Sequence, residues 1–394
     1  MKNRIIELKN KIYFHSFAAV GGYEEMRGPL GDHFDFCDES DKFGQNTWEL
    51  AEGEMGRISL NIAMNKAKIS QTQVDFLIAG DLQNQCVASS VGLSSFGIPY
   101  LGVYGACSTC TEALLLSSAL LQDEKFKIGA AVTSSHNSAA ERQFRTPLEY
   151  GGQRTGTAQW TATAAGAFIL SRGKPIKNNS TQESPCGNSD KCKKMQKSNG
   201  CESPEKAATE CGRPSKGGDN IKDKKEGASP EECSFFYPAI EEYMIGKIIS
   251  GETTDATNMG AAMAFAAADS IISYFRESGK SPTDFDFIFT GDLGQTGSNV
   301  LHDILEKENP ILVKKHRDCG LLLYDKNKQD VHSGASGCGT SASVLAAHIL
   351  PEMECGNIKN ILFLSTGALM SPSSILQKQP IYGIAPLIKI TAKM

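Results

Sequence analysis

The sequence contains one internal duplication, which constrains the fold more than any other feature. Three stretches of the first half recur in the same order in the second half, with unequal insertions between them. The matched pairs are residues 74–82 with 285–293, residues 104–109 with 337–341, and residues 128–135 with 360–367. One long repeat rules out a solenoid of short units and predicts two structurally similar halves.

The turn around Cys107 is the most informative of these stretches. Apolar residues 98–103 precede it and the largely apolar run 112–121 follows it, a pattern typical of strand, tight turn and helix. Cys107 would then lie at a helix N-terminus, where backbone N–H groups and the helix dipole favour the thiolate. The alternative is that a crowded turn simply needs a small side chain. Cys107 is therefore the first candidate site residue.

Two βα-rich halves, with a strand, cysteine and helix in the first, resemble the thiolase and ketoacyl-synthase superfamily. The resemblance implies an α/β fold of five alternating layers, α/β/α/β/α, made of two pseudo-equivalent halves. We place the N-terminal thiolase-like half at residues 1–172, an insertion at residues 173–236 and the C-terminal thiolase-like half at residues 237–394.

The catalytic partners that this superfamily provides for its cysteine do not appear in the second half. In the superfamily the cysteine attacks an acyl thioester, while His with His, or His with Asn, stabilises the oxyanion. The position that matches the first histidine holds Asp292, and the second turn holds Cys338 between two glycines. A carboxylate repels a developing oxyanion, so the usual condensation chemistry is not expected and Cys107 would be vestigial. The alternative is an active acyltransferase or β-ketoacyl synthase-like enzyme with Cys107 as its nucleophile.

Within the superfamily, the sequence resembles a family of sporulation proteins. The resemblance covers nearly the whole chain outside residues 172–236. It rests on residues 28–31, 48–52, 79–85, 105–109, 133–137, 140–145, 149–153 and 318–320. It implies binding of dipicolinic acid (pyridine-2,6-dicarboxylic acid), free or as its calcium chelate, during uptake of the acid into the developing spore. It also implies that membrane proteins of the same sporulation channel system are partners.

A polar run follows the third matched strand of the first half and suits such a ligand. Its members are Ser134, Ser135, His136, Asn137, Arg142 and Arg145. Guanidinium groups bind carboxylates through two hydrogen bonds, and two of them near hydroxyl groups would hold a small dianion. Together with Cys107, Asp292 and Cys338, these residues make up the predicted ligand site. The structural alternatives are ion pairs of the two arginines with Glu141 or Glu149, and a turn-forming role for Asp292.

Composition and charge narrow the classes of partner. The net charge of −5 and the pI near 5.9 give no broad basic field, so nucleic acid is not expected. The N-terminus lacks the apolar region of a signal peptide, and charges interrupt the longest apolar windows, so no transmembrane segment is predicted. We expect a peripheral protein on the cytoplasmic side of the forespore or spore inner membrane. We expect no cofactor and no protein-bound metal, with calcium only as part of the ligand chelate. The superfamily resemblance implies a homodimer.

Residues 173–233 differ in composition from the rest of the chain. Polar residues, glycine and proline dominate and aromatic residues are absent, so the segment cannot bury enough apolar surface to offset its ordering entropy. Five cysteines lie in it, but none are spaced as C-x-x-C and no histidine accompanies them, which disfavours zinc. We predict a disordered loop here, a second irregular stretch at residues 17–45 and a helix at residues 48–66.

Overall fold

The structure is a computed structural model that describes residues 3–144, 154–175 and 235–394. The chain divides into two compact units, one made of Met1–Ile176 and Phe236–Met394, the other of Lys177–Phe235. Nearly all of the predicted insertion, including its five cysteines, lies outside the described residues, as does Arg145. The disordered loop and the domain boundaries therefore stay predictions.

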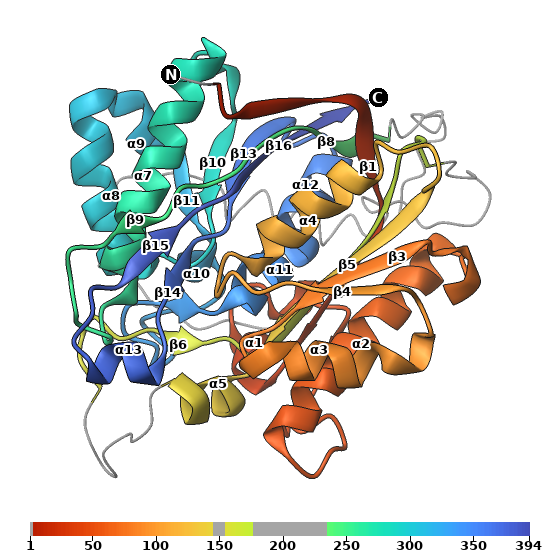
Figure 1. Cartoon of the computed structure of the whole chain (residues 1–394), viewed down its shortest axis with the longest axis horizontal. Coiled ribbons are helices and arrows are strands. Elements are labelled where there is room, and N and C mark those ends of the chain that lie inside the picture. The colour runs from red at the N-terminus through yellow and green to blue at the C-terminus, as the bar shows by residue number, and fades with distance from the viewer. Residues whose placement is uncertain (1–2, 145–153, 176–234) are drawn as a thin grey trace, which may run out of the picture. The chain divides into compact units, whose positions relative to one another are not determined.

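One mixed sheet forms the framework of the first unit (Figure 1). Its strands run in the order β11-β10-β13-β16-β8-β1-β7-β5-β3-β4, and β2 pairs with β1. The strands are β1 (Ile5–Gly21), β2 (Phe36–Cys37), β3 (Phe76–Gly80), β4 (Tyr100–Gly102), β5 (Ile128–Ser135), β7 (Ala164–Ser171), β8 (Tyr237–Met244), β10 (Phe287–Thr290), β11 (His316–Asp318), β13 (Asn360–Leu364) and β16 (Leu387–Lys393).

The two halves of this sheet have the same strand pattern. In the first half β4, β3 and β5 are parallel neighbours, followed by antiparallel β7 and β1. In the second half β11, β10 and β13 are parallel neighbours, followed by antiparallel β16 and β8. Backbone pairing of β1 with β8 joins the halves. The duplication predicted from the sequence is therefore a duplication of a five-stranded unit.

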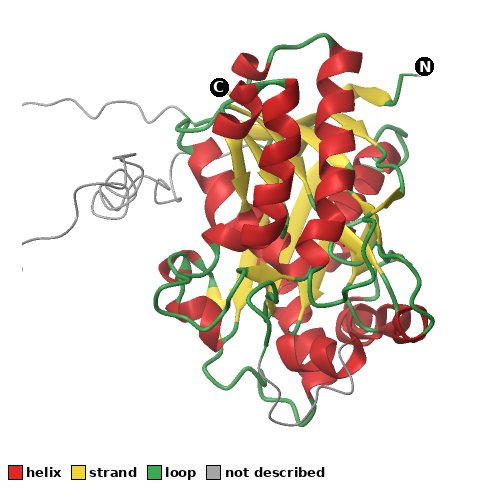
Figure 2. Ribbon diagram, turned by 90° about the vertical axis from the view of Figure 1, so that its left-hand side faces the viewer, coloured by secondary structure: helices red, strands yellow, loops and turns green. Residues whose placement is uncertain are grey.

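Helices cover both outer sides of the sheet halves and also lie between them (Figures 1 and 2). Figure 1 shows α7 and α8 outside the second half, α2 and α3 outside the first half, and α4 and α11 in the middle. The helices are α1 (Tyr23–Arg27), α2 (Trp48–Ala67), α3 (Val87–Leu93), α4 (Thr109–Leu120), α5 (Asn137–Phe144), α7 (Met259–Ser278), α8 (Gly294–Glu308), α9 (Pro310–Lys315), α10 (Cys319–Leu322), α11 (Cys338–Val344), α12 (Leu350–Glu354) and α13 (Pro372–Leu376). These layers confirm the predicted α/β/α/β/α arrangement.

Two small sheets lie beside this framework. One pairs β6 (Trp160–Thr161) with β12 (Ala335–Ser336), and the other contains β14 (Gly367–Leu369), β15 (Tyr382–Ile384) and β9 (Ile249–Ser250). The first of these sheets combines one strand from each half. The second combines strands from distant parts of the second half. None of the helices in the described ranges is both long enough and apolar enough to cross a bilayer.

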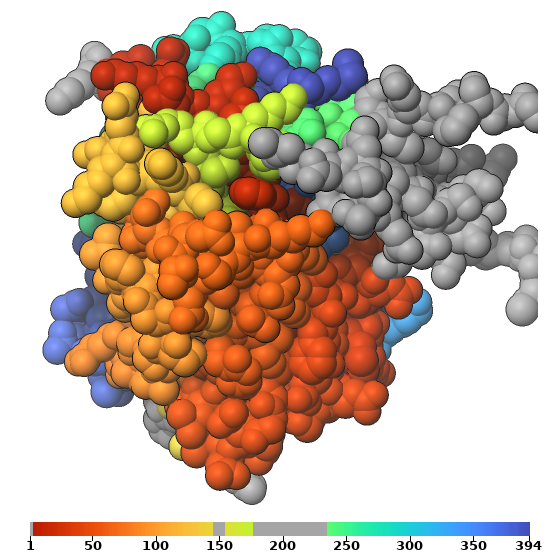
Figure 3. Space-filling model, turned by 90° about the vertical axis from the view of Figure 1, so that its right-hand side faces the viewer, coloured from red at the N-terminus to blue at the C-terminus, as the bar shows by residue number. Residues whose placement is uncertain are grey.

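Capping side chains set where the long outer helices begin. The Thr47 side chain accepts a hydrogen bond from the Leu50 backbone N–H and starts α2, which confirms the predicted helix at residues 48–66. The Asn258 side chain caps α7 in the same way through Ala261 N–H. The prediction that an irregular stretch begins at residue 17 was wrong, because β1 continues to Gly21 and α1 follows it. Figure 3 shows the first-half side of the molecule, where residues of that half make up most of the described surface.

Glycines allow the outer helices to pack closely in both halves. In the first half, a Cβ atom added to Gly53 of α2 would lie 3.0 Å from the Ala88 carbonyl oxygen of α3. In the second half, a Cβ atom on Gly297 of α8 would lie 2.5 Å from the Gly260 carbonyl oxygen of α7. Close packing of two outer helices at a glycine therefore occurs in both halves. In each case a side chain at the glycine would collide with the backbone of the neighbouring helix.

Candidate functional site

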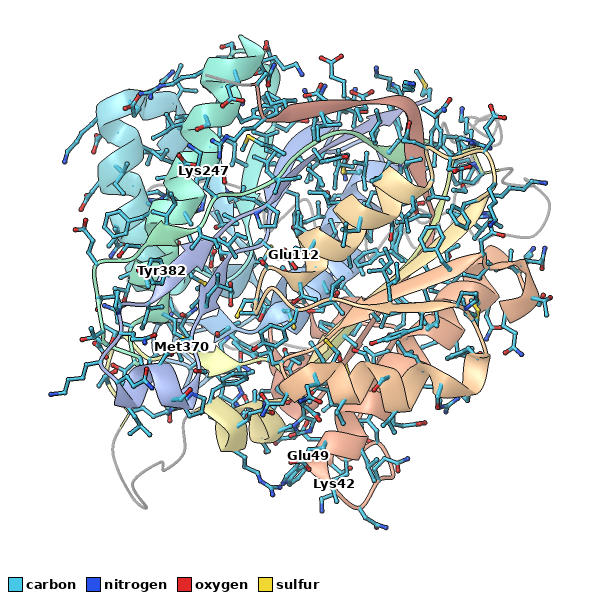
Figure 4. The ribbon with its side chains drawn as sticks, in the orientation of Figure 1. Lys42, Glu49, Glu112, Lys247, Met370 and Tyr382 are labelled. Atoms are coloured by element: carbon cyan, nitrogen blue, oxygen red, sulfur yellow. The ribbon has the colours of Figure 1, made fainter. Side chains whose placement is uncertain are left out.

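A pocket lies where the two halves of the first unit meet. Most of its lining is apolar and comes from both halves: Leu82, Tyr104, Ala106, Ala140, Phe144, Met259, Ala368 and Met370. Its polar lining is formed by Cys107, Glu141, Thr161 and Ser336. Figure 4 labels Met370, which follows β14. The pocket therefore offers an apolar slot with a few hydroxyl, thiol and carboxyl groups.

The turn that presents Cys107 is fixed by local hydrogen bonds. Ala106 has a φ of 52°, the left-handed conformation that non-glycine residues seldom adopt. The Thr109 hydroxyl accepts from Gly105 N–H at 3.1 Å and donates to the Ala106 carbonyl at 2.7 Å. Helix α4 then begins at Thr109. The predicted sequence of strand, turn and helix is confirmed, and the Cys107 side chain is only 6% exposed.

Asp292 lies directly behind Cys107, at the turn that follows β10. Its carboxylate accepts hydrogen bonds from Gly337 N–H at 2.9 Å and from the Thr366 hydroxyl at 2.9 Å. The Cys107 thiol and, at 3.4 Å, the Ser336 hydroxyl also donate to it. Burial raises the pKa of Asp292 to about 7, although these donors favour the charged form.

The thiol of Cys107 is held in its protonated form. Burial and then the adjacent Asp292 carboxylate raise its pKa well above the ordinary value. The thiolate expected from the helix N-terminus was therefore wrong, because desolvation and a neighbouring negative charge outweigh the helix dipole. Among the residues that the structure describes, the thiol interacts with Asp292, Ser336 and Gly337, and none of these is a histidine.

Ser134, Ser135 and Cys338 make contacts inside the protein rather than lining the pocket. The Ser135 hydroxyl donates to the Ala162 carbonyl at 2.7 Å and accepts from Gly339 N–H at 3.1 Å. The Cys338 thiol donates to the Ser134 carbonyl at 2.9 Å. These bonds join β5 to the start of α11, so they fix the middle layer against the sheet.

His136 and Asn137 face neighbouring loops. The His136 Nε2 atom lies 2.8 Å from the Asp41 carbonyl oxygen, so Nε2 carries the hydrogen, and the ring packs against Trp48 with 5.3 Å between centroids. Burial lowers the pKa of His136, which favours the neutral ring. The Asn137 side chain donates to the Thr161 carbonyl at 3.1 Å. Neither residue is in the lining of the pocket.

Arg142 lies on the outer side of α5. Its side chain is 63% exposed and pairs with Glu49 at 3.4 Å. Glu149, one of the two alternative partners predicted for it, lies outside the described residues. Figure 4 shows Glu49 and Lys42 close together and away from Met370 at the pocket. Arg145, the second predicted guanidinium, lies outside the described residues. The structure therefore brings Cys107 and Asp292 together, but not the polar run as a whole.

One further buried carboxyl group near the site, that of Glu52, was missed by sequence reasoning. Glu52 of α2 accepts from the Gln83 side-chain amide at 2.8 Å, and its pKa is raised well above the ordinary value by burial and by nearby Asp81. The apolar spacing of α2 puts Glu52 on its buried face, which is the signal that could have revealed it. Asp81 itself accepts from Gln83 N–H and Ser89 N–H, both at 2.8 Å, which is a turn-forming role.

Asp318 holds the turn that carries Asp292. Its carboxylate accepts from Leu293 N–H at 2.9 Å and Gly294 N–H at 3.0 Å, at the start of α8. The Thr290 hydroxyl donates to the same group at 2.7 Å. Burial raises the pKa of Asp318 to about 6. In the part of the chain that the structure describes, no three His, Cys, Asp or Glu side chains are grouped to hold a metal ion.

Comparisons with known proteins agree with this architecture. The family model described as Stage V sporulation protein AD (SpoVAD) matches residues 2–184 and 227–391. Stage V sporulation protein AD of Bacillus subtilis (strain 168) is 33% identical over 377 residues, which are 96% of this chain and 93% of that protein. An OleA variant of Xanthomonas campestris superposes with a TM-score of 0.54 at 11% identity, covering 98% of this chain and 100% of OleA. Cerulenin-bound OleA gives 0.52 at 11% identity, with 97% and 96% covered. The OleA structures show the thiolase fold alone, whereas the family match and the curated relative show that the chain belongs to the stage V sporulation protein AD family.

Proposed function

We propose that this protein is a noncatalytic, thiolase-fold binding protein for dipicolinic acid, free or as its calcium chelate, and acts with membrane channel proteins in uptake of the acid into the developing spore. Membership of a sporulation family supports the biological setting. The chemistry of the pocket supports binding without turnover. The identity of the proposed ligand rests on the resemblance of the sequence to the family.

The observation that carries the proposal is the contact between Cys107 and Asp292. A thiol attacks an acyl group only as the thiolate, and the buried carboxylate keeps the proton on the Cys107 sulfur. The same negative charge would oppose the oxyanion that forms during acyl transfer. The pocket is therefore suited to holding a ligand without attacking it.

The pocket lining fits a small aromatic ring that carries polar groups. Tyr104 and Phe144 offer aromatic faces, and Met259 and Met370 offer polarisable sulfur atoms that pack well against rings. The Ser336 hydroxyl lies in the same lining and can donate to a carboxylate. We also propose that Arg142 and Arg145, which are not in this lining, bind the carboxylates of the ligand.

Calorimetry with dipicolinate, and separately with its calcium chelate, tests the proposal. Wild type is expected to bind, and Met370→Ala is expected to bind more weakly because it removes one wall of the pocket. Met394→Ala is the matched control, since Met394 is 73% exposed at the C-terminus. Arg142→Ala tests the predicted guanidinium contact. Absence of any binding heat with wild type would remove the proposal.

Acyl transfer by Cys107 is the second candidate function. It is favoured by the position of Cys107 directly after a left-handed residue and before α4, which presents the sulfur to the pocket. Mass spectrometry after incubation with acyl-coenzyme A would show an adduct on Cys107. An adduct that forms and turns over would replace the binding proposal.

We also propose that the protein is a homodimer and lies peripherally on the cytoplasmic side of the forespore or spore inner membrane. Strand β4 ends the large sheet, and Leu101 on it is 52% exposed. An open sheet edge with an exposed leucine can pair with a second copy of the chain. Fractionation of sporulating cells, with and without the channel subunits, tests the membrane association.

A further inference from the structure

Two side chains of the pocket lining contact the buried carboxylate of Asp292. Cys107 and Ser336 both belong to the pocket lining, and both donate a hydrogen bond to the Asp292 carboxylate. Asp292 itself is fully buried. The charge of this carboxylate therefore acts on whatever occupies the pocket, and its protonation state decides which way the thiol and hydroxyl hydrogens point.

The groups around Asp292 supply donors but no positive charge among the described contacts. It meets Cys107 from the turn before α4, and Ser336 and Gly337 from β12 and the turn before α11. It meets Thr366 from the turn between β13 and β14. The charged or titratable neighbours on the side of β11 and α10 are Asp318 and Cys319, and Asp318 raises the pKa of Asp292 further. The pKa of about 7 places the change of charge near neutral pH.

A dianion in the pocket makes the charged form of Asp292 less favourable. Two like charges in a buried site raise the pKa of the weaker acid, as in paired carboxylates. A protonated Asp292 accepts weaker hydrogen bonds from Cys107 and Ser336 than the carboxylate does. Both groups line the pocket, so both become available as donors to a carboxylate of the ligand.

We propose that binding of a dianionic dicarboxylate in this pocket is coupled to uptake of one proton by Asp292, which releases Cys107 and Ser336 to donate to the ligand. The inference rests on the proposed function. The balance is simple: the free protein with ionised Asp292, the dianion and one solvent proton give a complex with neutral Asp292. Because the pKa of Asp292 is higher in the complex than in the free protein, affinity falls as pH rises above about 7, by up to tenfold per pH unit.

The test is calorimetry with dipicolinate at pH 7.5 in phosphate and in Tris, buffers with different heats of ionisation. The difference in apparent binding heat counts the protons taken up, and wild type is expected to take up about half to three-quarters of a proton, because Asp292 is already partly protonated at this pH. Asp292→Asn is expected to take up none and to keep a constant Kd from pH 6.5 to pH 8.5. Glu141→Gln is the matched control, because Glu141 also lines the pocket, and it is expected to retain the uptake. The neutral calcium chelate is expected to bind without proton uptake.

The outcomes separate this inference from the function on which it rests. No binding by wild type at any pH would remove the proposed function itself. Binding with no proton exchange would overturn the inference and leave the function in place. Loss of the uptake in Glu141→Gln but not in Asp292→Asn would also overturn it, since the proton would then belong to Glu141. If Asp292→Asn does not fold, as judged by circular dichroism, the wild-type proton count and its pH dependence still decide.

Discussion

Replacing Gly297 of α8 by alanine tests both the packing of the second half and the placement of Asp292. The new Cβ atom would lie 2.5 Å from the Gly260 carbonyl oxygen and 2.6 Å from its carbon, both in the backbone of α7. Since favourable carbon contacts begin near 3.5 Å, the two helices must move apart by about 1 Å. Overpacking of this kind costs about 1–3 kcal/mol, and removing a helical glycine returns about 0.5–1 kcal/mol. We expect a net loss of about 1–2 kcal/mol.

Gly56→Ala is the matched control for this substitution. Gly56 lies within α2, and a Cβ atom there would be 3.8 Å from its nearest neighbour, Val132, which is an ordinary contact. This variant should therefore gain about 0.5–1 kcal/mol. Urea midpoints of the two variants and of wild type, followed by circular dichroism, measure the difference of about 2 kcal/mol.

The same pair of variants has a functional readout. Helix α8 begins at Gly294, two residues after Asp292, so movement of α8 displaces the Asp292 turn. We expect dipicolinate to bind Gly297→Ala more weakly than Gly56→Ala in calorimetry. If the two variants were equally stable and bound the ligand equally, close packing at Gly297 would not be what positions this part of the site.

Three other predictions follow from individual side chains. Iodoacetamide at pH 8 should alkylate Cys107 slowly in wild type and faster in Asp292→Asn, because the charge that raises the pKa of the thiol is gone; equal rates in timed peptide mass spectrometry would contradict this. Burial raises the pKa of Glu25 from 4.5 to about 7, so its neutral form is favoured on folding and stability should fall by up to about 3 kcal/mol as pH rises from 4.5 through 7. Urea unfolding at pH 5 and pH 8 should show a smaller fall for Glu25→Gln than for wild type. Leu101→Arg on the edge strand β4 should convert the proposed dimer to a monomer in sedimentation experiments, and a wild type that already sediments as a monomer would refute the dimer.

The sequence predicted the architecture well because the duplication is written into strand and helix patterns. Matching residues 74–82 with 285–293 was enough to predict equivalent strands, which are β3 and β10. The same match placed Asp292 where the superfamily has a catalytic histidine, and the structure puts its carboxyl against Cys107. Strands and helices can be predicted from long apolar patterns because an element that buries one face must carry apolar residues at regular spacing.

The orientation of the polar run could not be predicted from the sequence. Ser135 lies on a strand that is covered on both faces, so a hydroxyl there finds a partner inside the protein and not in the pocket. A helix begins at Asn137, and its 3.6-residue period turns Arg142 outward while Ala140 and Glu141 reach the pocket lining. The pKa of Cys107 could not be predicted either. It depends on how far burial and the Asp292 charge outweigh the helix dipole, and a sequence motif does not show burial.

The pairing of β1 with β8 restricts how a ligand can enter the pocket. Backbone pairing at Ile5–Glu7 and again at Ile12 and Tyr13 joins the two halves along their shared edge. Many two-lobed binding proteins admit a ligand by rotating their lobes about a hinge and then clamping shut. Main-chain pairing on both sides of the irregularity between Glu7 and Ile12 opposes that rotation here. Entry must depend on rotamer changes and loop displacement at the rim, so the shape of the rim, rather than clamping, has to provide selectivity.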